Sequence, residues 1–110
     1  MNAFYAGKGE TEVEIKKEKN GNAMEIKVSG RLDTTTAPDL EKEIQASIDG
    51  VDELTFDFEG LEYISSAGLR VLLATQKIMN KQGTMKVVSV SQPVMEVFEI
   101  TGFSEILTIE

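Results

Sequence analysis

Hydrophobic and polar positions alternate with a period of two in three segments of the chain, and this pattern predicts strands. The segments 13–16 and 24–28 alternate apolar and charged residues on either side of "NGN" at 20–22, whose residues tolerate the positive φ of a tight turn. Together they predict an antiparallel hairpin. The segment "LTFDFE" at 54–59 alternates in the same way, so we expect this strand to have one buried face and one solvated face.

Apolar residues at helical spacing predict three helices. The first begins near Pro38, which suits a first helical turn, with a threonine or Asp33 nearby to cap it. The second covers residues 66–81. The third begins near Pro93 and ends at Gly102.

The remaining segments complete an α/β pattern. Residues 82–90 indicate a turn and then a strand with apolar residues on both faces, as is typical near the centre of a sheet, and 104–110 indicate a short final strand. The order is therefore β-β-α-β-α-β-α-β, which predicts an α/β fold with a mostly parallel sheet after the opening hairpin. Because the strand at 54–59 alternates, we expect the helices largely on one face of the sheet. Residues 1–10 are expected to be a flexible lead-in and 11–110 a single domain.

The composition excludes several classes of partner and of chemistry. Eleven Lys and Arg against 19 Asp and Glu give a formal net charge of −8, which disfavours nucleic acid and anionic membranes and favours a basic patch on a partner protein. No segment approaches the ~18 consecutive apolar residues of a membrane span, so no membrane insertion is expected. The chain has no Cys and no His, which excludes disulfides, the usual zinc sites and a Ser-His relay, and no cofactor is expected. The lack of Cys fits the reducing cytoplasm.

Two adjacent serines, Ser65 and Ser66, lie where a strand and loop lead into the second helix. In a purely structural role, a serine hydroxyl caps the helix and stabilises it by about 1 kcal/mol. In a switch, a phosphate adds a charge of about −1.5 to −2 at the positive end of the helix dipole, with Arg70 four residues further on. Glu59 and Glu62 would repel this phosphate. The local residues alone leave both roles open.

Two stretches give the chain a resemblance to a known family: "GRLDTTTAPDL" at 30–40 and "LTFDFEGLEYISSAGLRVLL" at 54–73. With the strand and helix order, they resemble the STAS domain of bacterial anti-sigma factor antagonists, over the chain from about Val13 to its end. The resemblance implies a STAS-type β-α superhelix that binds an anti-sigma factor serine kinase when unphosphorylated and so frees a sigma factor. It further implies that phosphorylation blocks this complex and that a PP2C-type phosphatase restores it. Such a protein is a cytoplasmic regulator of transcription and not an enzyme.

The resemblance also implies which residues form the site. The family's Gly-Leu pair matches Gly68 and Leu69, which places the phosphoacceptor at Ser66. Many family members have aspartate directly before the acceptor, where this chain has Ser65, so Ser65 is the second candidate. Asp33 matches the acidic residue of the family's Gly-x-Leu-Asp motif, on a loop near the acceptor.

The partner-binding surface expected from this match comprises Asp33, Thr34, Tyr63, Ser65, Gly68 and Arg70. Several of these residues also have a plainer explanation. Asp33 suits a turn or a helix cap, and Arg70 suits a solvated helix face. Tyr63 is expected to pack against the sheet in preference to serving as an exposed aromatic anchor.

Two other classes of function remain open at this point. One is a constitutive STAS interaction module or a module that binds a small ligand such as a nucleotide, for example an accessory subunit of lipid transport. The other is a small hydrolase that uses Ser65 or Ser66, which would need activation by lysine, aspartate or a metal. No motif places Lys77, Lys81 or Lys86 near the serines, and no Walker-type loop or dinucleotide glycine pattern is present. The enzyme is therefore disfavoured.

Overall fold

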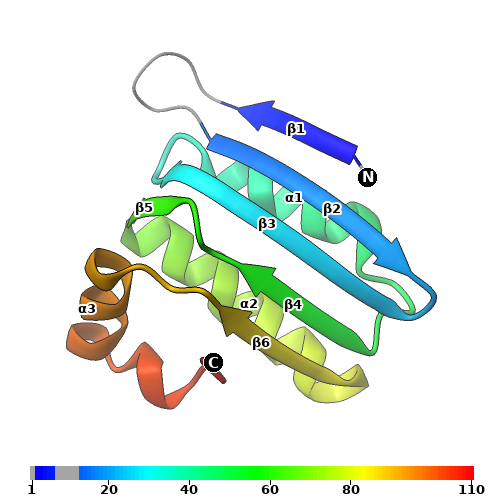
Figure 1. Cartoon of the computed structure of the whole chain (residues 1–110). Helices are drawn as coiled ribbons and strands as arrows, with labels where there is room; N and C mark the ends of the chain where they lie inside the picture. The colour runs from blue at the N-terminus through cyan, green and yellow to red at the C-terminus, as the bar shows by residue number, and fades with distance from the viewer. Residues whose placement is uncertain (1, 7–12) are drawn as a thin grey trace.

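The computed structural model of the chain describes residues 2–6 and 13–110, and these form an α/β fold with a mixed sheet (Figure 1). The elements in chain order are β1 (Asn2–Ala6), β2 (Val13–Asn20), β3 (Ala23–Leu32), α1 (Ala37–Ser47), β4 (Glu53–Asp57), β5 (Leu61–Ile64), α2 (Ser66–Gln82), β6 (Thr84–Val88), α3 (Gln92–Thr101) and the 3-10 turn η2 (Phe103–Glu105). The sheet order is β1-β2-β3-β4-β6, and β5 pairs with β3 beyond the end of β4. The pairs β1–β2 and β2–β3 are antiparallel and the others are parallel.

The predicted hairpin is confirmed. Strands β2 and β3 pair as far as Asn20 and Ala23, so Gly21 and Asn22 form a two-residue turn. Gly21 has a φ of 65°, and glycine adopts this left-handed conformation without the steric cost of a side chain.

The start of the chain differs from the expectation. Residues 1–10 were expected to be a flexible lead-in, but Asn2–Ala6 forms β1 and pairs with β2, with Ala6 opposite Val13. The five residues of β1 have no strong alternation of their own, and the strand is defined by backbone pairing with the edge of β2. Such a long-range partner leaves little signal in a local pattern. Residues 7–10 lie outside the described part of the chain.

Strand β3 pairs with two strands in succession. Its residues 23–27 pair with β4 and its residues 30–32 pair with β5. The register shifts between Gly30 and Arg31, as in a β-bulge, and Gly30 has a φ of 94°. Strand β5 was not predicted as a separate element, because four residues with buried ends and exposed middle positions do not alternate.

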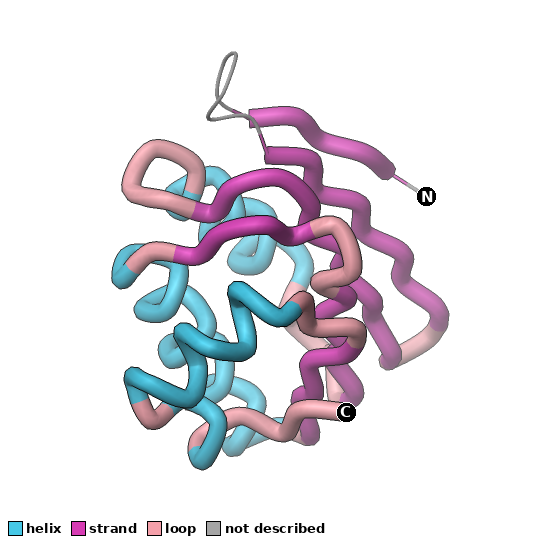
Figure 2. The backbone as a smooth tube through the Cα atoms, turned by 60° about the vertical axis from the view of Figure 1, so that its left-hand side comes forward, coloured by secondary structure: helices cyan, strands magenta, loops and turns pink. Residues whose placement is uncertain are grey.

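Helices α1 and α2 lie on one face of the sheet, as predicted (Figures 1 and 2). The main core fills the space between this face and the helices. Its largest buried side chains include Ile15, Ile26, Leu40, Leu54, Phe56, Phe58, Leu72 and Met79. The opposite face of the sheet carries charged residues and threonines, which explains the alternation at 54–59.

The C-terminal part of the sheet also differs from the prediction. Strand β6 ends the strand order instead of lying near the centre, as residues 82–90 suggested. The predicted final strand at 104–110 is reduced to a single parallel bridge between Ile109 and Val87. Within the described residues, no helix is both long enough and apolar enough to cross a membrane.

Candidate functional site

The two serines have different roles at the start of α2. Ser65 is the N-cap residue, with extended backbone angles (φ −97°, ψ 177°), and its hydroxyl oxygen accepts a hydrogen bond from the Gly68 N–H at 3.5 Å. Its carbonyl oxygen accepts the first helical hydrogen bond, from the Leu69 N–H at 2.9 Å. Ser66 is the first helical residue and is exposed. The cap is therefore made by one serine, and the hydroxyl of the other is open to solvent.

The surroundings of Ser66 suit an anion. The N–H groups of Ser66 and Ala67 make no hydrogen bond within the described part of the chain, as is usual for the first residues of a helix. The first turn of α2 contains no acidic residue, and the helix dipole places partial positive charge there. Arg70 is exposed one turn further along the helix. Glu59 and Glu62, which precede the site in the chain, are exposed acidic residues.

A backbone hydrogen bond joins the start of α2 to the end of β3. The Ser65 N–H donates to the Leu32 carbonyl oxygen at 2.9 Å. Asp33 and Thr34 follow Leu32 directly, so the loop that carries them lies beside the loop that carries the serines. The predicted neighbourhood of Asp33 and the serines is thus present in the fold.

Asp33 is held in a compact turn before α1. Its carboxylate oxygen Oδ1 accepts hydrogen bonds from the Thr35 N–H at 3.0 Å and the Thr36 N–H at 3.2 Å. The Thr36 hydroxyl, which is fully buried, donates to the Arg31 carbonyl oxygen at 2.8 Å and accepts from the Asp33 N–H at 2.9 Å. Thr36 occupies the N-cap position of α1, but its hydroxyl holds this turn and does not cap the helix. Asp33 has the turn role considered from the sequence, while Thr34 is exposed.

Tyr63 does not pack into the core, in contrast to the expectation from the sequence. The residue is 40% exposed, and the guanidinium carbon of Arg31 lies 4.3 Å from the centre of its ring. Arg31 and Tyr63 are register partners on β3 and β5. This cation–π contact, worth about 0.5–1 kcal/mol at an exposed site, holds an aromatic side chain at the surface two residues before Ser65. Sequence reasoning missed Arg31, because the bulge that pairs it with Tyr63 leaves no local signal.

Gly68 is buried and allows α2 to approach the sheet. A Cβ atom at this position would lie 2.8 Å from Cγ1 of Ile64 and 3.0 Å from Cγ of Leu32. The glycine is therefore required by close packing, and as a buried residue it offers little surface for the partner contact expected of it. Its effect on the site is to fix the position of the helix start.

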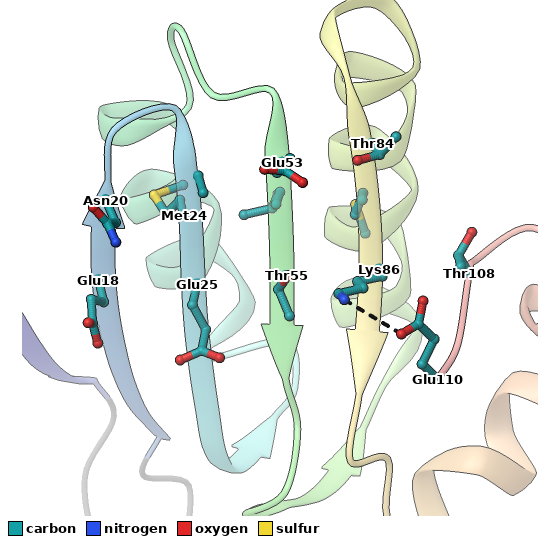
Figure 3. Close-up of a pocket in the computed structure, with 13 residues that line it drawn as sticks. Glu18, Asn20, Met24, Glu25, Glu53, Thr55, Thr84, Lys86, Thr108 and Glu110 are labelled. Carbon is teal, nitrogen blue, oxygen red and sulfur yellow. Dashed lines mark ion pairs between the residues drawn. The ribbon is translucent and has the colours of Figure 1, made fainter.

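A shallow groove of about 540 Å³ lies on the open face of the sheet (Figure 3), and neither serine lines it. Its polar side chains come from β2, β3, β4, β6 and the C-terminal segment, and its acidic members are Glu18, Glu25, Glu53 and Glu110. Lys86 forms an ion pair with Glu110 at 3.5 Å. In the described part of the chain, no three Asp or Glu side chains come together closely enough to hold a metal ion. An acidic groove of this kind does not suit a phosphate-bearing ligand.

The roles of the two serines predict different effects on stability. Ser65→Ala removes the cap and should lower the free energy of unfolding by about 0.5–1 kcal/mol, the lower end of the usual range because the hydrogen bond is long. Ser66→Ala should change the free energy of unfolding by less than about 0.5 kcal/mol from that of the parent chain, since Ser66 is exposed. Urea denaturation of both variants measures the difference. An equal loss in the two would contradict the assignment of the cap to Ser65.

Gly68→Ala should destabilise the fold. Overpacking against Leu32 and Ile64 costs about 1–3 kcal/mol, and the higher helix propensity of alanine offsets up to about 1 kcal/mol, so the net loss should be about 1 kcal/mol. Ala74→Leu, which adds volume at an exposed position of the same helix, is the control and should be nearly neutral. Urea denaturation measures both variants. If Gly68→Ala proves as stable as the parent chain, the packing of position 68 against Leu32 and Ile64 is not tight.

Comparison with a family model, with related sequences and with solved structures points to one protein family. The model of the STAS domain family matches residues 14–110. An anti-sigma-B factor antagonist of Staphylococcus aureus is 32% identical over 85 residues, which cover 76% of this chain and 79% of that protein. The crystal structure of an anti-sigma factor antagonist from Mycobacterium paratuberculosis superposes with a TM-score of 0.80 at 28% identity, over 88% of this chain and 84% of the other.

The anti-sigma factor antagonist SpoIIAA, a cell fate determinant of Bacillus, has the same fold in its unphosphorylated and phosphorylated forms. The unphosphorylated form superposes with a TM-score of 0.76 at 20% identity, over 87% of this chain and 87% of the other. The phosphorylated form superposes with a TM-score of 0.69 at 19% identity, over 87% of this chain and 90% of the other. The family match, the sequence identity and the mixed sheet with its three helices agree, and the chain belongs to the STAS domain family, with bacterial anti-sigma factor antagonists as its relatives.

Proposed function

We propose that this protein is an anti-sigma factor antagonist controlled by phosphorylation of Ser66. Unphosphorylated, it binds an anti-sigma factor with serine kinase activity and so releases a sigma factor. Phosphorylation of Ser66 by that kinase ends the complex, and a PP2C-type phosphatase restores the binding form. The protein acts in the cytoplasm through the single domain at 11–110, as a regulator and not as an enzyme.

The exposed hydroxyl of Ser66 at the first helical position is the observation that carries this proposal. A kinase needs the acceptor oxygen within reach, and Ser66 is exposed while Ser65 is partly buried. Because Ser65 already caps α2, Ser66 is free to be modified without loss of the cap. The same comparison makes Ser65 the weaker acceptor, since its modification would disturb the cap.

The electrostatics support a phosphate that is accepted but only moderately stabilised. The unpaired N–H groups of Ser66 and Ala67 and the dipole of α2 favour added negative charge, and Arg70 stands one turn away. Glu59 and Glu62 oppose it. The added charge of about −1.5 to −2 therefore changes the sign and bulk of the surface while the helix stays in place.

The partner's surface meets the residues around Ser66. Tyr63, held out by Arg31, supplies an exposed aromatic anchor of the kind that is enriched in protein interfaces. Thr34 and Arg70 are also exposed, and the turn at Asp33 fixes the second loop of the site. A kinase surface that fits this arrangement would be forced to accommodate a dianion after phosphorylation, and its affinity would fall.

The alternative functions have less support. A module that binds nucleotides would need a site for phosphates, and the groove on the open face is acidic. A constitutive interaction module would use the same exposed residues without a change at Ser66. A hydrolase would need a group that activates one of the serines, but Lys86 lines the groove on the open face, which neither serine lines, and is paired there with Glu110.

Ser66→Asp should weaken binding to the cognate anti-sigma factor kinase at least tenfold, about 1.4 kcal/mol, with the fold unchanged. Asn80→Asp adds the same charge at an exposed position near the other end of α2 and should bind as the parent does. Ser66→Ala should also retain binding. Isothermal titration with the purified kinase measures all three. Equal affinity of Ser66→Asp and the parent would contradict a switch at this position.

Incubation with the cognate kinase and ATP should add one phosphate, and peptide mass spectrometry should locate it on Ser66. Ser65→Ala should still be phosphorylated, whereas Ser66→Ala should not. A phosphate found on Ser65 would move the switch by one residue. Tight binding to the kinase without any phosphorylation would favour the constitutive module.

A further inference from the structure

The surface formed by α3 and η2, here called the α3 surface, exposes large apolar side chains. Val94 and Phe98 on the inner side of α3 are buried, but Ile100 is 85% exposed and Ile106 is 48% exposed. A single exposed isoleucine needs no explanation in a soluble protein. Here Ile100 lies on α3 and Ile106 directly follows η2, which packs on α3, and Val97 on α3 is only half-buried, so large apolar side chains are exposed on adjoining parts of the chain.

Every charge on this surface is negative. The chain from 87 to 110 contains four glutamates and no Lys or Arg. Glu110 is paired with Lys86, but Glu96, Glu99 and Glu105 form no ion pair within the described part of the chain. Glu96 lies one turn before Ile100 on α3, so an unpaired carboxylate and the most exposed isoleucine occupy neighbouring positions on the helix surface.

This combination of exposed isoleucines and unpaired carboxylates selects one kind of occupant. Acidic phospholipid surfaces and nucleic acid are repelled by the three free glutamates. A second copy of the same surface would bring glutamates against glutamates, which is unfavourable. A helix with leucines on one face and lysines or arginines beside them offers both an apolar contact for Ile100 and Ile106 and positive charges for the glutamates.

We propose that the α3 surface is a docking site for a basic amphipathic helix of a partner protein. The site adjoins the strand that carries Tyr63, because α3 packs against β5 and the Ser91 hydroxyl donates to the Leu61 carbonyl oxygen at 2.9 Å. It does not include Ser66. Binding there is independent of the phosphorylation proposed above, and the two proposals succeed or fail separately.

The test is NMR titration of the ¹⁵N-labelled full chain with a synthetic helix of about 18 residues, long enough to be helical, with leucines at i, i+3, i+4 and i+7 and lysines elsewhere. The expected result is a set of chemical-shift changes confined to residues 95–106. Ile100→Ser should weaken binding about tenfold, because the buried apolar contact is lost while the charge is unchanged. Ile78→Ser makes the same change at the 38%-exposed isoleucine on α2 and should have no effect.

Four results would overturn the proposal. One is a set of shifts centred on the acidic groove at Glu18, Glu25 and Glu53, which would indicate attraction by charge alone. Another is equal binding of a peptide with serine in place of every leucine. The third is equal loss of affinity in Ile100→Ser and Ile78→Ser. A peptide with glutamate in place of lysine should not bind, and its binding would also contradict the proposed chemistry.

Discussion

The close approach of the first turn of α2 to the ends of β3 and β5 positions the whole candidate site. Gly68 removes the side chain that would strike Leu32 and Ile64, and the Ser65 N–H is then near enough to bond the Leu32 carbonyl oxygen. That hydrogen bond joins two loops that are about thirty residues apart in the chain. Without the glycine the helix would stand further from the sheet, and the serines would move away from the turn at Asp33. Close packing of apolar atoms thus determines the geometry of a polar surface.

The bulge at Gly30 is the second constraint on the site. Because β3 must pair first with β4 and then with β5, its register has to shift, and a glycine with positive φ accommodates the shift. Beyond the bulge, Arg31 stands opposite Tyr63 and holds its ring at the surface. Three of the four residues in the Gly-x-Leu-Asp segment therefore have a structural role. Gly30 allows the bulge, Leu32 contacts the start of α2, and Asp33 forms the turn before α1.

Local periodicity was sufficient for the parts of the fold whose signal is local. The hairpin, the three helices and the solvated face of β4 follow from residues within a few positions of one another. The short strands β1 and β5 were missed, because their existence depends on backbone pairing with distant strands. The position of β6 at the end of the strand order was missed for the same reason. At the site, Ser66, Ser65 and Asp33 could be singled out from the motif, whereas Arg31, the exposure of Tyr63 and the burial of Gly68 required the bulge and the helix packing to be known.

The separation of the capping serine from the exposed serine would let Ser66 carry the proposed switch without a change of fold. If a single serine served both as cap and as acceptor, its modification would disturb the N–H groups that hold the helix start. Here Ser65 keeps the cap, and the Ser66 hydroxyl makes no hydrogen bond within the described part of the chain. A phosphate on Ser66 would then meet the helix dipole and the N–H groups of Ser66 and Ala67, which make no hydrogen bond within the described residues, so the scaffold would remain stable in both states. Under the proposed switch, the difference in partner binding would accordingly come from the surface itself, through charge and bulk at the contact. A rearrangement of the core is not required.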